Sequence, residues 1–294
     1  MKILLATQKP FAAAAVNGIR SILEEAGNEV VLLEKYAGED ELVAAVADVD
    51  AMIIRSDKVT ARVLDAAPKL KIVVRAGAGF DNVDLAAATA HGVVVENTPG
   101  QNSNAVAELA IAMMIYMSRN QFTPATGTEI SGKTVGIQAF GNVGRLVGQK
   151  AAALGMKVKA VDPFIPAEKI AEAGAEPVAD VAALYASSDF VSVHIPALPS
   201  TIGSIGYDLI TSMPKGAVLV NTARKEVIDE AGLERALEDR PDLKYVEKFG
   251  VRIFATPKKM GAQTSEANVN AGLAAARQIV AYFTEGCTRF QVNK

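Results

Sequence analysis

Short apolar runs alternate with alanine-rich segments along the first part of the chain. The runs are rich in β-branched residues and are continuous rather than alternating, which is typical of parallel strands covered on both faces. The predicted strands are residues 3–6, 30–33, 52–54, 72–74 and 93–95. Segments between them, such as 11–26 and 42–47, have a helical pattern. This alternation predicts one doubly wound α/β unit over about the first 95 residues.

A long apolar helix and a second alternating series follow. Residues 103–118 are apolar on nearly every face, so we expect a buried helix. After a polar loop, strands are predicted at residues 135–139, 158–161, 190–195 and 218–220, and a last helix at 266–284. The fold class expected for the chain is therefore α/β, with two doubly wound parallel-sheet domains.

Composition narrows the class of protein. The chain has 294 residues, enough for about two domains. Its net charge is −3 with no basic block, which argues against nucleic acid as a partner. No apolar run is long enough to span a membrane, and the N-terminal segment is too short for a signal peptide. A single cysteine, Cys287, indicates a reducing cytoplasm, and no cluster of cysteine and histidine suggests a metal site.

The second unit opens with a pattern that predicts dinucleotide binding. The strand at 135–139 leads into a turn and then a helix, which begins near Gly144. Gly141 would let the backbone approach a pyrophosphate, and Gly144 would let the helix pack closely on the sheet. Ala139 stands where the first glycine of such motifs is usual, which weakens the pattern. The residues predicted to contact the cofactor at this turn are Phe140, Gly141, Asn142, Val143 and Gly144.

Asp162 ends the next predicted strand. A carboxylate at this place can accept hydrogen bonds from both ribose hydroxyls and would repel a 2′-phosphate. We therefore predict NAD rather than NADP as the cofactor.

Four further segments carry a family resemblance. They are RAGAGFDNVDL at 75–85, NTPGQNSNAVAELA at 97–110, VSVHIP at 191–196 and VLVNTARKEVIDE at 218–230. With the nucleotide turn, they resemble the D-isomer-specific 2-hydroxyacid dehydrogenases, and within that family a short class that acts on D-3-phosphoglycerate. The resemblance implies a flavodoxin-like substrate domain, residues 1–97 plus 265–294, and a Rossmann NAD domain, residues 98–264. It places the active site in the cleft between them.

The resemblance also implies an activity and the residues that carry it. The activity is NAD-dependent oxidation of D-3-phosphoglycerate to 3-phosphohydroxypyruvate, the first step of serine biosynthesis. Arg224 would hold and polarise the C2 oxygen, a role that suits a permanently charged, two-pronged donor. The backbone of Ala76 and Gly77 would hold the substrate carboxylate. The resemblance further places Arg55, Ser56 and Asn102 near the substrate, and His194, Pro196, Thr222 and Ala223 along the cofactor.

Lys258 stands where most of the family has its catalytic histidine. We expect Lys258 to be the general base for oxidation. A free lysine has a pKa of about 10.4, and burial beside Arg224 and Lys259 would lower it. Three alternatives stay open: Lys259 acts instead, Lys258 only binds phosphate, or both lysines are solvated.

A phosphorylated substrate needs local cations despite the acidic chain. Lys9 follows the first predicted strand and Arg55 the third, with Lys58 close behind. In open α/β sheets ligands bind at this end of the strands, so these residues are predicted to converge on the phosphate. The alternative is that such lysines are ordinary solvated loop residues.

One departure from the family leaves the function partly open. The segment 244–252 is about a dozen residues shorter than the resemblance implies. A usual loop between two elements has only about 4–6 residues. Either residues are truly deleted or the printed sequence lacks a loop, and the acidic partner of the base is not assigned. Two alternative functions remain: a hydroxypyruvate, glyoxylate or other 2-hydroxyacid reductase, and an NAD-binding sensor that has lost turnover.

Two expectations concern assembly and regulation. We expect a homodimer, with the apolar helix at 103–118 near its interface. The chain ends at Lys294 without room for the regulatory domain of longer relatives, so we expect no feedback by serine through such a domain.

Overall fold

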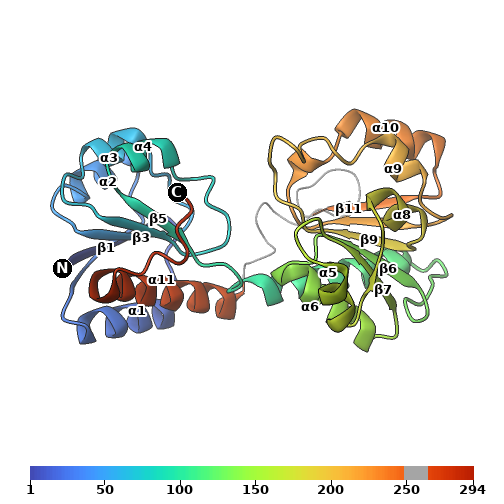
Figure 1. The fold of residues 1–294 in the computed structure, drawn as a ribbon, viewed down its shortest axis with the longest axis horizontal. Helices are drawn as coiled ribbons and strands as arrows, with labels where there is room; N and C mark the ends of the chain where they lie inside the picture. The colour runs from blue at the N-terminus through green and yellow to red at the C-terminus, as the bar shows by residue number, and fades with distance from the viewer. Residues whose placement is uncertain (248–263) are drawn as a thin grey trace. The chain divides into compact units, whose positions relative to one another are not determined.

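The computed structural model of the protein describes residues 1–247 and 264–294. These residues form two compact units, one built from residues 1–102 and 264–294 and the other from residues 103–247. Each unit is a parallel sheet with helices on both faces (Figure 1). The predicted fold class, α/β with two doubly wound parallel sheets, is confirmed.

The first unit contains a five-stranded sheet in the order β2-β1-β3-β4-β5, which is the flavodoxin-like order. Its strands are β1 (Lys2–Thr7), β2 (Glu29–Glu34), β3 (Ala51–Ile54), β4 (Ile72–Arg75) and β5 (Val94–Asn97). The expectation that every strand is covered on both faces is wrong for β2. It lies at the sheet edge, where Glu29 and Leu32 are exposed.

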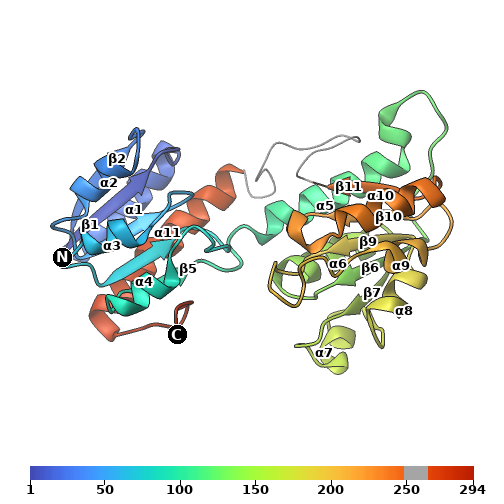
Figure 2. The same ribbon diagram turned by 90° about the horizontal axis from the view of Figure 1, so that it is seen from above.

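Alternate residues of each inner strand face two separate cores in the first unit. Ile3 and Leu5 pack with α1 (Ala13–Glu25) and α11 (Ser265–Glu285), which lie side by side on one face. Leu4 and Ala6 belong to the core on the opposite face. The helices of that face are α2 (Glu39–Ala45), α3 (Ala61–Asp65) and α4 (Leu85–Ala90) (Figure 2). The C-terminal helix thus completes a unit that begins at the N-terminus.

The second unit contains a six-stranded sheet in the order β11-β10-β9-β6-β7-β8, which is the Rossmann order. Its strands are β6 (Thr134–Gln138), β7 (Lys157–Val161), β8 (Glu176–Pro177), β9 (Phe190–Val193), β10 (Val218–Asn221) and β11 (Lys244–Glu247). The two-residue strand β8 was not predicted, because it is too short to give an apolar run.

The helices of the second unit also cover both faces. On one face lie α5 (Ser103–Ser118) and α6 (Asn142–Ala153), and on the other α8 (Val181–Ala186), α9 (Tyr207–Thr211) and α10 (Glu230–Asp239). The short α7 (Ala167–Glu172) follows β7, and two 3₁₀ turns occupy Asn120–Phe122 and Lys225–Val227. The predicted burial of α5 is confirmed, since most of its side chains lie in the core. Of the helices that the structure describes, none has the length and apolarity to cross a membrane.

Candidate active site

The turn after β6 keeps its tight geometry although its first glycine is replaced. Ala139 adopts a φ of +74°, in the left-handed region that residues with a side chain rarely enter. Phe140 follows, buried at 1% exposure, and Gly141 is the N-cap of α6. The backbone therefore forms the expected turn at some cost in strain at Ala139.

The two remaining glycines of the turn have different surroundings. A Cβ added at Gly144 would lie 2.2 Å from the carbonyl oxygen of Ala139, so only glycine lets α6 sit this close to β6. A Cβ added at Gly141 would meet no atom within 4 Å, so the space beside the turn is open. No side chain caps the N-terminus of α6. The first-turn N–H groups have no intrahelical acceptors, and with the helix dipole they suit an anion such as a pyrophosphate.

Asp162 ties the turn to the loop after β7. One carboxylate oxygen accepts a hydrogen bond from the Phe140 N–H and the other from the Phe164 N–H, both at 2.8 Å. Each carboxylate oxygen has a second lone pair. The carboxylate is thus held rigidly beside the turn and retains capacity to accept from ribose hydroxyls. These features together fit a dinucleotide without a 2′-phosphate.

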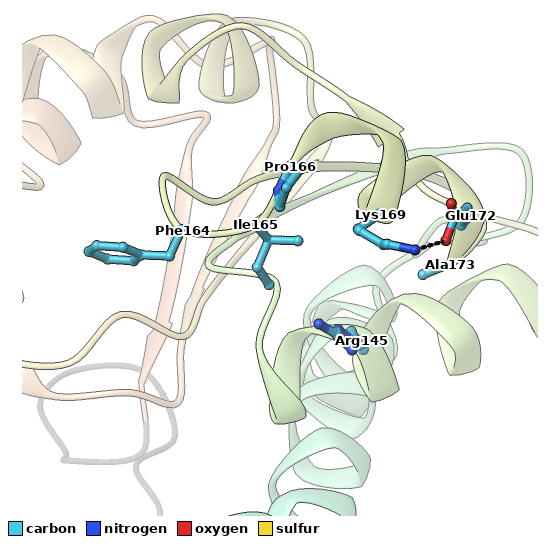
Figure 3. A pocket seen from close by; sticks show the side chains of 7 residues that line it. All are labelled: Arg145, Phe164, Ile165, Pro166, Lys169, Glu172 and Ala173. Atoms are coloured by element: carbon cyan, nitrogen blue, oxygen red, sulfur yellow. Dashed lines mark hydrogen bonds and ion pairs between the residues drawn. The ribbon is translucent and has the colours of Figure 1, made fainter.

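The loop that follows Asp162 borders two surface cavities. The larger, of about 460 Å³, is lined by Arg145, Phe164, Ile165, Pro166, Lys169, Glu172 and Ala173 (Figure 3). The Lys169 ammonium is paired with the Glu172 carboxylate at 2.7 Å, and Arg145 donates to the Phe140 carbonyl at 3.1 Å. Phe164 points away from the ion pair and is 90% exposed. A second cavity of about 390 Å³ lies between Asp162 and the residues that follow β8. Sequence reasoning missed the exposed Phe164.

His194 lies just beyond β9, with hydroxyl groups near both ring nitrogens. The Ser192 hydroxyl is 2.9 Å from Nε2, and the Thr222 hydroxyl is 3.5 Å from Nδ1. The backbone N–H of His194 donates to the backbone carbonyl of Gln138 on the neighbouring strand β6. The histidine is therefore part of a polar network at the carboxyl ends of β6, β9 and β10. Pro196, two residues further, lies in the loop after β9. Sequence reasoning did not identify Ser192.

Arg224 lies in a turn organised by a buried asparagine. Asn221, at 0% exposure, donates through Nδ2 to the Arg224 carbonyl and accepts from the Ala223 N–H, both at 2.9 Å. Arg224 is half-buried, three residues past the end of β10. The Asn221 role was not assigned from sequence, although a polar residue directly after the apolar run at 218–220 is a signal for it.

The predicted phosphate cations follow two adjacent strands of the first unit. Lys9 is exposed after β1, and its carbonyl accepts a hydrogen bond from the Thr7 hydroxyl at 2.6 Å. Arg55 follows β3, and its guanidinium carbon lies 5.6 Å from the centre of the Phe11 ring. Burial lowers the pKa of Arg55, and the nearby Asp57 carboxylate opposes this shift. Ser56, beside Arg55, is exposed.

Of the two backbone N–H groups predicted to bind the substrate carboxylate, that of Ala76 is already hydrogen-bonded within the protein. The Ala76 N–H donates to the Ile54 carbonyl at 2.8 Å, so it is already engaged in the sheet. Gly77 has a φ of +150°, a backbone conformation that residues with a side chain rarely adopt, so the position favours glycine. We therefore retain Gly77 rather than Ala76 as the candidate backbone donor. Asn102 is half-buried, directly before α5.

Two predictions fall largely outside the described residues. Lys258 and Lys259 lie there. Of the short segment 244–252, only Lys244–Glu247 is described, as β11 paired in parallel with β10. Within residues 1–247 and 264–294, no group of three or more histidine, cysteine, aspartate or glutamate side chains is placed to hold a metal ion.

Comparison with known sequences gives a consistent result. The sequence pattern of the D-isomer specific 2-hydroxyacid dehydrogenase catalytic domain matches residues 12–293. The D-3-phosphoglycerate dehydrogenase of Mycobacterium tuberculosis is 38% identical over 270 residues, covering 82% of this chain and 50% of that protein. The rat protein of the same name is 41% identical over 234 residues, covering 74% of this chain and 43% of its own. The chain thus spans about half the length of the curated relatives it matches.

Solved structures show the same architecture. The NAD⁺-bound 3-phosphoglycerate dehydrogenase of Entamoeba histolytica is 46% identical, with a TM-score of 0.91, covering 100% of this chain and 99% of that one. D-2-hydroxyisocaproate dehydrogenase, 20% identical with a TM-score of 0.84, covers 100% of both chains and shows the fold alone.

Proposed function

The chain belongs to the D-isomer specific 2-hydroxyacid dehydrogenase family, and on this premise we propose that it oxidises D-3-phosphoglycerate to 3-phosphohydroxypyruvate with NAD. One observation carries the proposal. The Ala139–Gly144 turn, the Asp162 carboxylate and Arg224 follow strands β6, β7 and β10 of one Rossmann sheet, at the edge where such sheets bind ligands. The 46% identity to an NAD⁺-bound 3-phosphoglycerate dehydrogenase supports the choice of substrate and cofactor. By this proposal the enzyme would catalyse the first step of serine biosynthesis.

The second unit is the proposed NAD domain. The turn residues Phe140 to Gly144 would hold the pyrophosphate, and Asp162 the adenosine ribose. The exposed Phe164 ring offers a flat apolar face suited to an adenine. His194, Pro196, Thr222 and Ala223 would line the remainder of the cofactor. The bound nicotinamide supplies the hydride acceptor.

The chain's own residues would supply the charge and the proton acceptor. Arg224 would bind the C2 oxygen and the carboxylate, because a guanidinium can hold two oxygens at once. Lys258, outside the described residues, is proposed as the base that takes the hydroxyl proton. The charge of Arg224 would favour the neutral, proton-accepting form of a lysine placed beside it.

The first unit is the proposed substrate domain. Lys9 and Arg55 follow adjacent strands and would bind the phosphate, with Ser56 beside them. The Gly77 backbone and Asn102 would hold the carboxylate end.

We also propose a homodimer that works in the reducing cytoplasm, with no nucleic acid or membrane as partner. Phe122, 69% exposed, packs edge-on against Tyr116 of α5 with ring centres 5.2 Å apart. This aromatic surface adjoins the helix expected near the interface. Sedimentation at a mass twice the 30.8 kDa of one chain is the expected result.

The test is NADH formation from D-3-phosphoglycerate and NAD across pH. We expect turnover in the wild type that rises with a basic pKa, loss of that activity in Lys258→Ala, and a fall of kcat/KM by about 100-fold or more in Arg224→Ala. Lys215→Ala, at an exposed lysine before β10, is the matched control and should leave turnover unchanged.

Other outcomes would redirect the proposal. Unchanged turnover in Lys258→Ala would leave that lysine as a phosphate ligand or a solvated residue. A preference for glyoxylate or hydroxypyruvate would favour the general reductase. A wild type that binds NADH without turning over any 2-hydroxy acid would favour the sensor.

A further inference from the structure

A buried aspartate lies beneath the proposed phosphate site. Asp57 is two residues past Arg55 and only 3% exposed. Its carboxylate accepts hydrogen bonds from the Gln8 N–H at 2.7 Å, the Tyr36 hydroxyl at 2.7 Å and the Arg55 N–H at 3.2 Å. Gln8 follows β1, Tyr36 follows β2 and Arg55 follows β3. One side chain thus joins three strand-end loops.

A fourth loop is joined through the backbone of the same residue. The Asp57 carbonyl accepts from Nδ2 of Asn82 at 2.6 Å. Asn82 lies in the loop after β4, the loop that contains Gly77. Because β2, β1, β3 and β4 are consecutive in the sheet, Asp57 connects the carboxyl ends of four adjacent strands.

This network fixes the backbone of the two loops that carry the cations. Gln8 directly precedes Lys9, and the bond from the Thr7 hydroxyl to the Lys9 carbonyl fixes the same loop from the other side. The backbone N–H of Arg55 donates to the Asp57 carboxylate, and the Arg55 guanidinium lies over the Phe11 ring. Removing the carboxylate would release both loops at once.

The network needs a carboxylate and not a neutral amide. Three donors converge on it, and an ionised carboxyl group has acceptors only, whereas an asparagine has one acceptor oxygen and an NH₂ donor group. Burial and the bond to Asp57 raise the pKa of Tyr36, so its hydroxyl stays protonated and donates. An Asp57→Asn substitution would therefore set an NH₂ group against one of the N–H donors.

We propose that Asp57 is a positioning residue: it sets the placement of Lys9 and Arg55, and the site thereby favours a phosphorylated 2-hydroxy acid over its unphosphorylated analogue. This inference rests on the proposed function. The carboxylate itself does not touch the substrate, since it is enclosed by its donors.

The test compares 3-phosphohydroxypyruvate with hydroxypyruvate in NADH-dependent reduction by the full chain. In Asp57→Asn we expect kcat/KM for the phosphorylated substrate to fall about 10- to 100-fold, mainly through KM, because charge-assisted contacts to phosphate are misplaced. The values for hydroxypyruvate and the KM for NADH should stay within about twofold. A merely structural role would lower both substrates equally.

Two further variants complete the design. Tyr36→Phe removes one donor of the network and should give the same selective loss at smaller size, about 2- to 10-fold. Asp65→Asn, at an aspartate whose side chain is 68% exposed and paired with His91, is the matched control and should change neither substrate.

Equal losses for both substrates, no loss, or tighter use of the phosphorylated substrate in Asp57→Asn would overturn the inference. If Asp57→Asn does not fold, Tyr36→Phe decides, and absence of selective loss there overturns it. If the wild type reduces neither substrate, the proposed function fails separately. Calorimetric binding of D-3-phosphoglycerate then tests the inference, and equal affinity in wild type and variant would contradict it.

Discussion

At the scale of single residues, the cofactor turn shows how a fold tolerates an imperfect motif. Ala139 holds a left-handed φ of +74° because its N–H donates to the Val161 carbonyl and the following Phe140 N–H donates to Asp162. These bonds over-determine the backbone, so the strain persists. An alanine in this region is less stable than a glycine.

Ala139→Gly is therefore expected to stabilise the protein. Relief of the left-handed alanine outweighs the entropy that glycine adds to the unfolded chain, for a net gain of about 0.5–1 kcal/mol. Urea unfolding of the two proteins measures the change. Ala152→Gly, at an exposed position in the last turn of α6, is the control and should lose up to about 1 kcal/mol. A destabilised Ala139→Gly protein would mean that this backbone is not strained.

Residue chemistry that depends on long-range contacts was the part hidden from the sequence. Asp162 was predicted because it ends an apolar strand run, where ligand-binding residues of such sheets lie, whereas Arg224 was predicted from the family resemblance. Asp57 was passed over because its donors, Gln8 and Tyr36, are distant in the chain and meet it only in the fold. The engaged Ala76 N–H was likewise invisible, since its acceptor Ile54 is on another strand.

At the scale of elements, hydrophobic patterning located the strands well. The continuous runs predicted at 52–54, 72–74 and 218–220 lie within β3, β4 and β10, since inner parallel strands need apolar residues on both faces. The predicted strand at 190–195 ran two residues too long, because β9 ends at Val193 and the apolar Ile195 continues into the loop. The order of the strands in each sheet was predicted from the family resemblance and not from the hydrophobic pattern.

The packing of α6 against β6 gives the two glycines of the turn different roles: Gly144 is needed for packing, and Gly141 is proposed for cofactor binding. In Gly144→Ala the new Cβ would lie 2.2 Å from a backbone oxygen, which cannot yield like a flexible side chain. We expect a loss of about 1–3 kcal/mol of folding stability. Gly141→Ala meets nothing within 4 Å, so it should fold normally and bind NADH more weakly. Thermal unfolding and fluorescence titration with NADH distinguish the two effects. The reverse pattern, a stable Gly144→Ala and an unstable Gly141→Ala, would contradict this assignment.

At the scale of the whole molecule, the two units differ in how the chain forms them: the first is made of two separate segments and the second of one. The first unit is not complete until α11 has been made, because Ala275 and Ile279 fill the core beneath α1. The second unit is continuous in sequence within the described residues. Each unit presents its own set of strand carboxyl ends, so each is expected to hold a different ligand.

This division predicts two separate footprints in amide hydrogen exchange. NADH at about 100 times its Kd adds about 2.7 kcal/mol against opening of the unit that holds it. Its greatest protection should therefore fall on residues 139–145 and 162–165. D-3-phosphoglycerate should instead protect residues 8–9 and 55–57, the loops that Asp57 joins. Strong protection by NADH alone at 55–57, or none there by D-3-phosphoglycerate, would show that the cofactor and phosphate sites are not divided between the two units in this way.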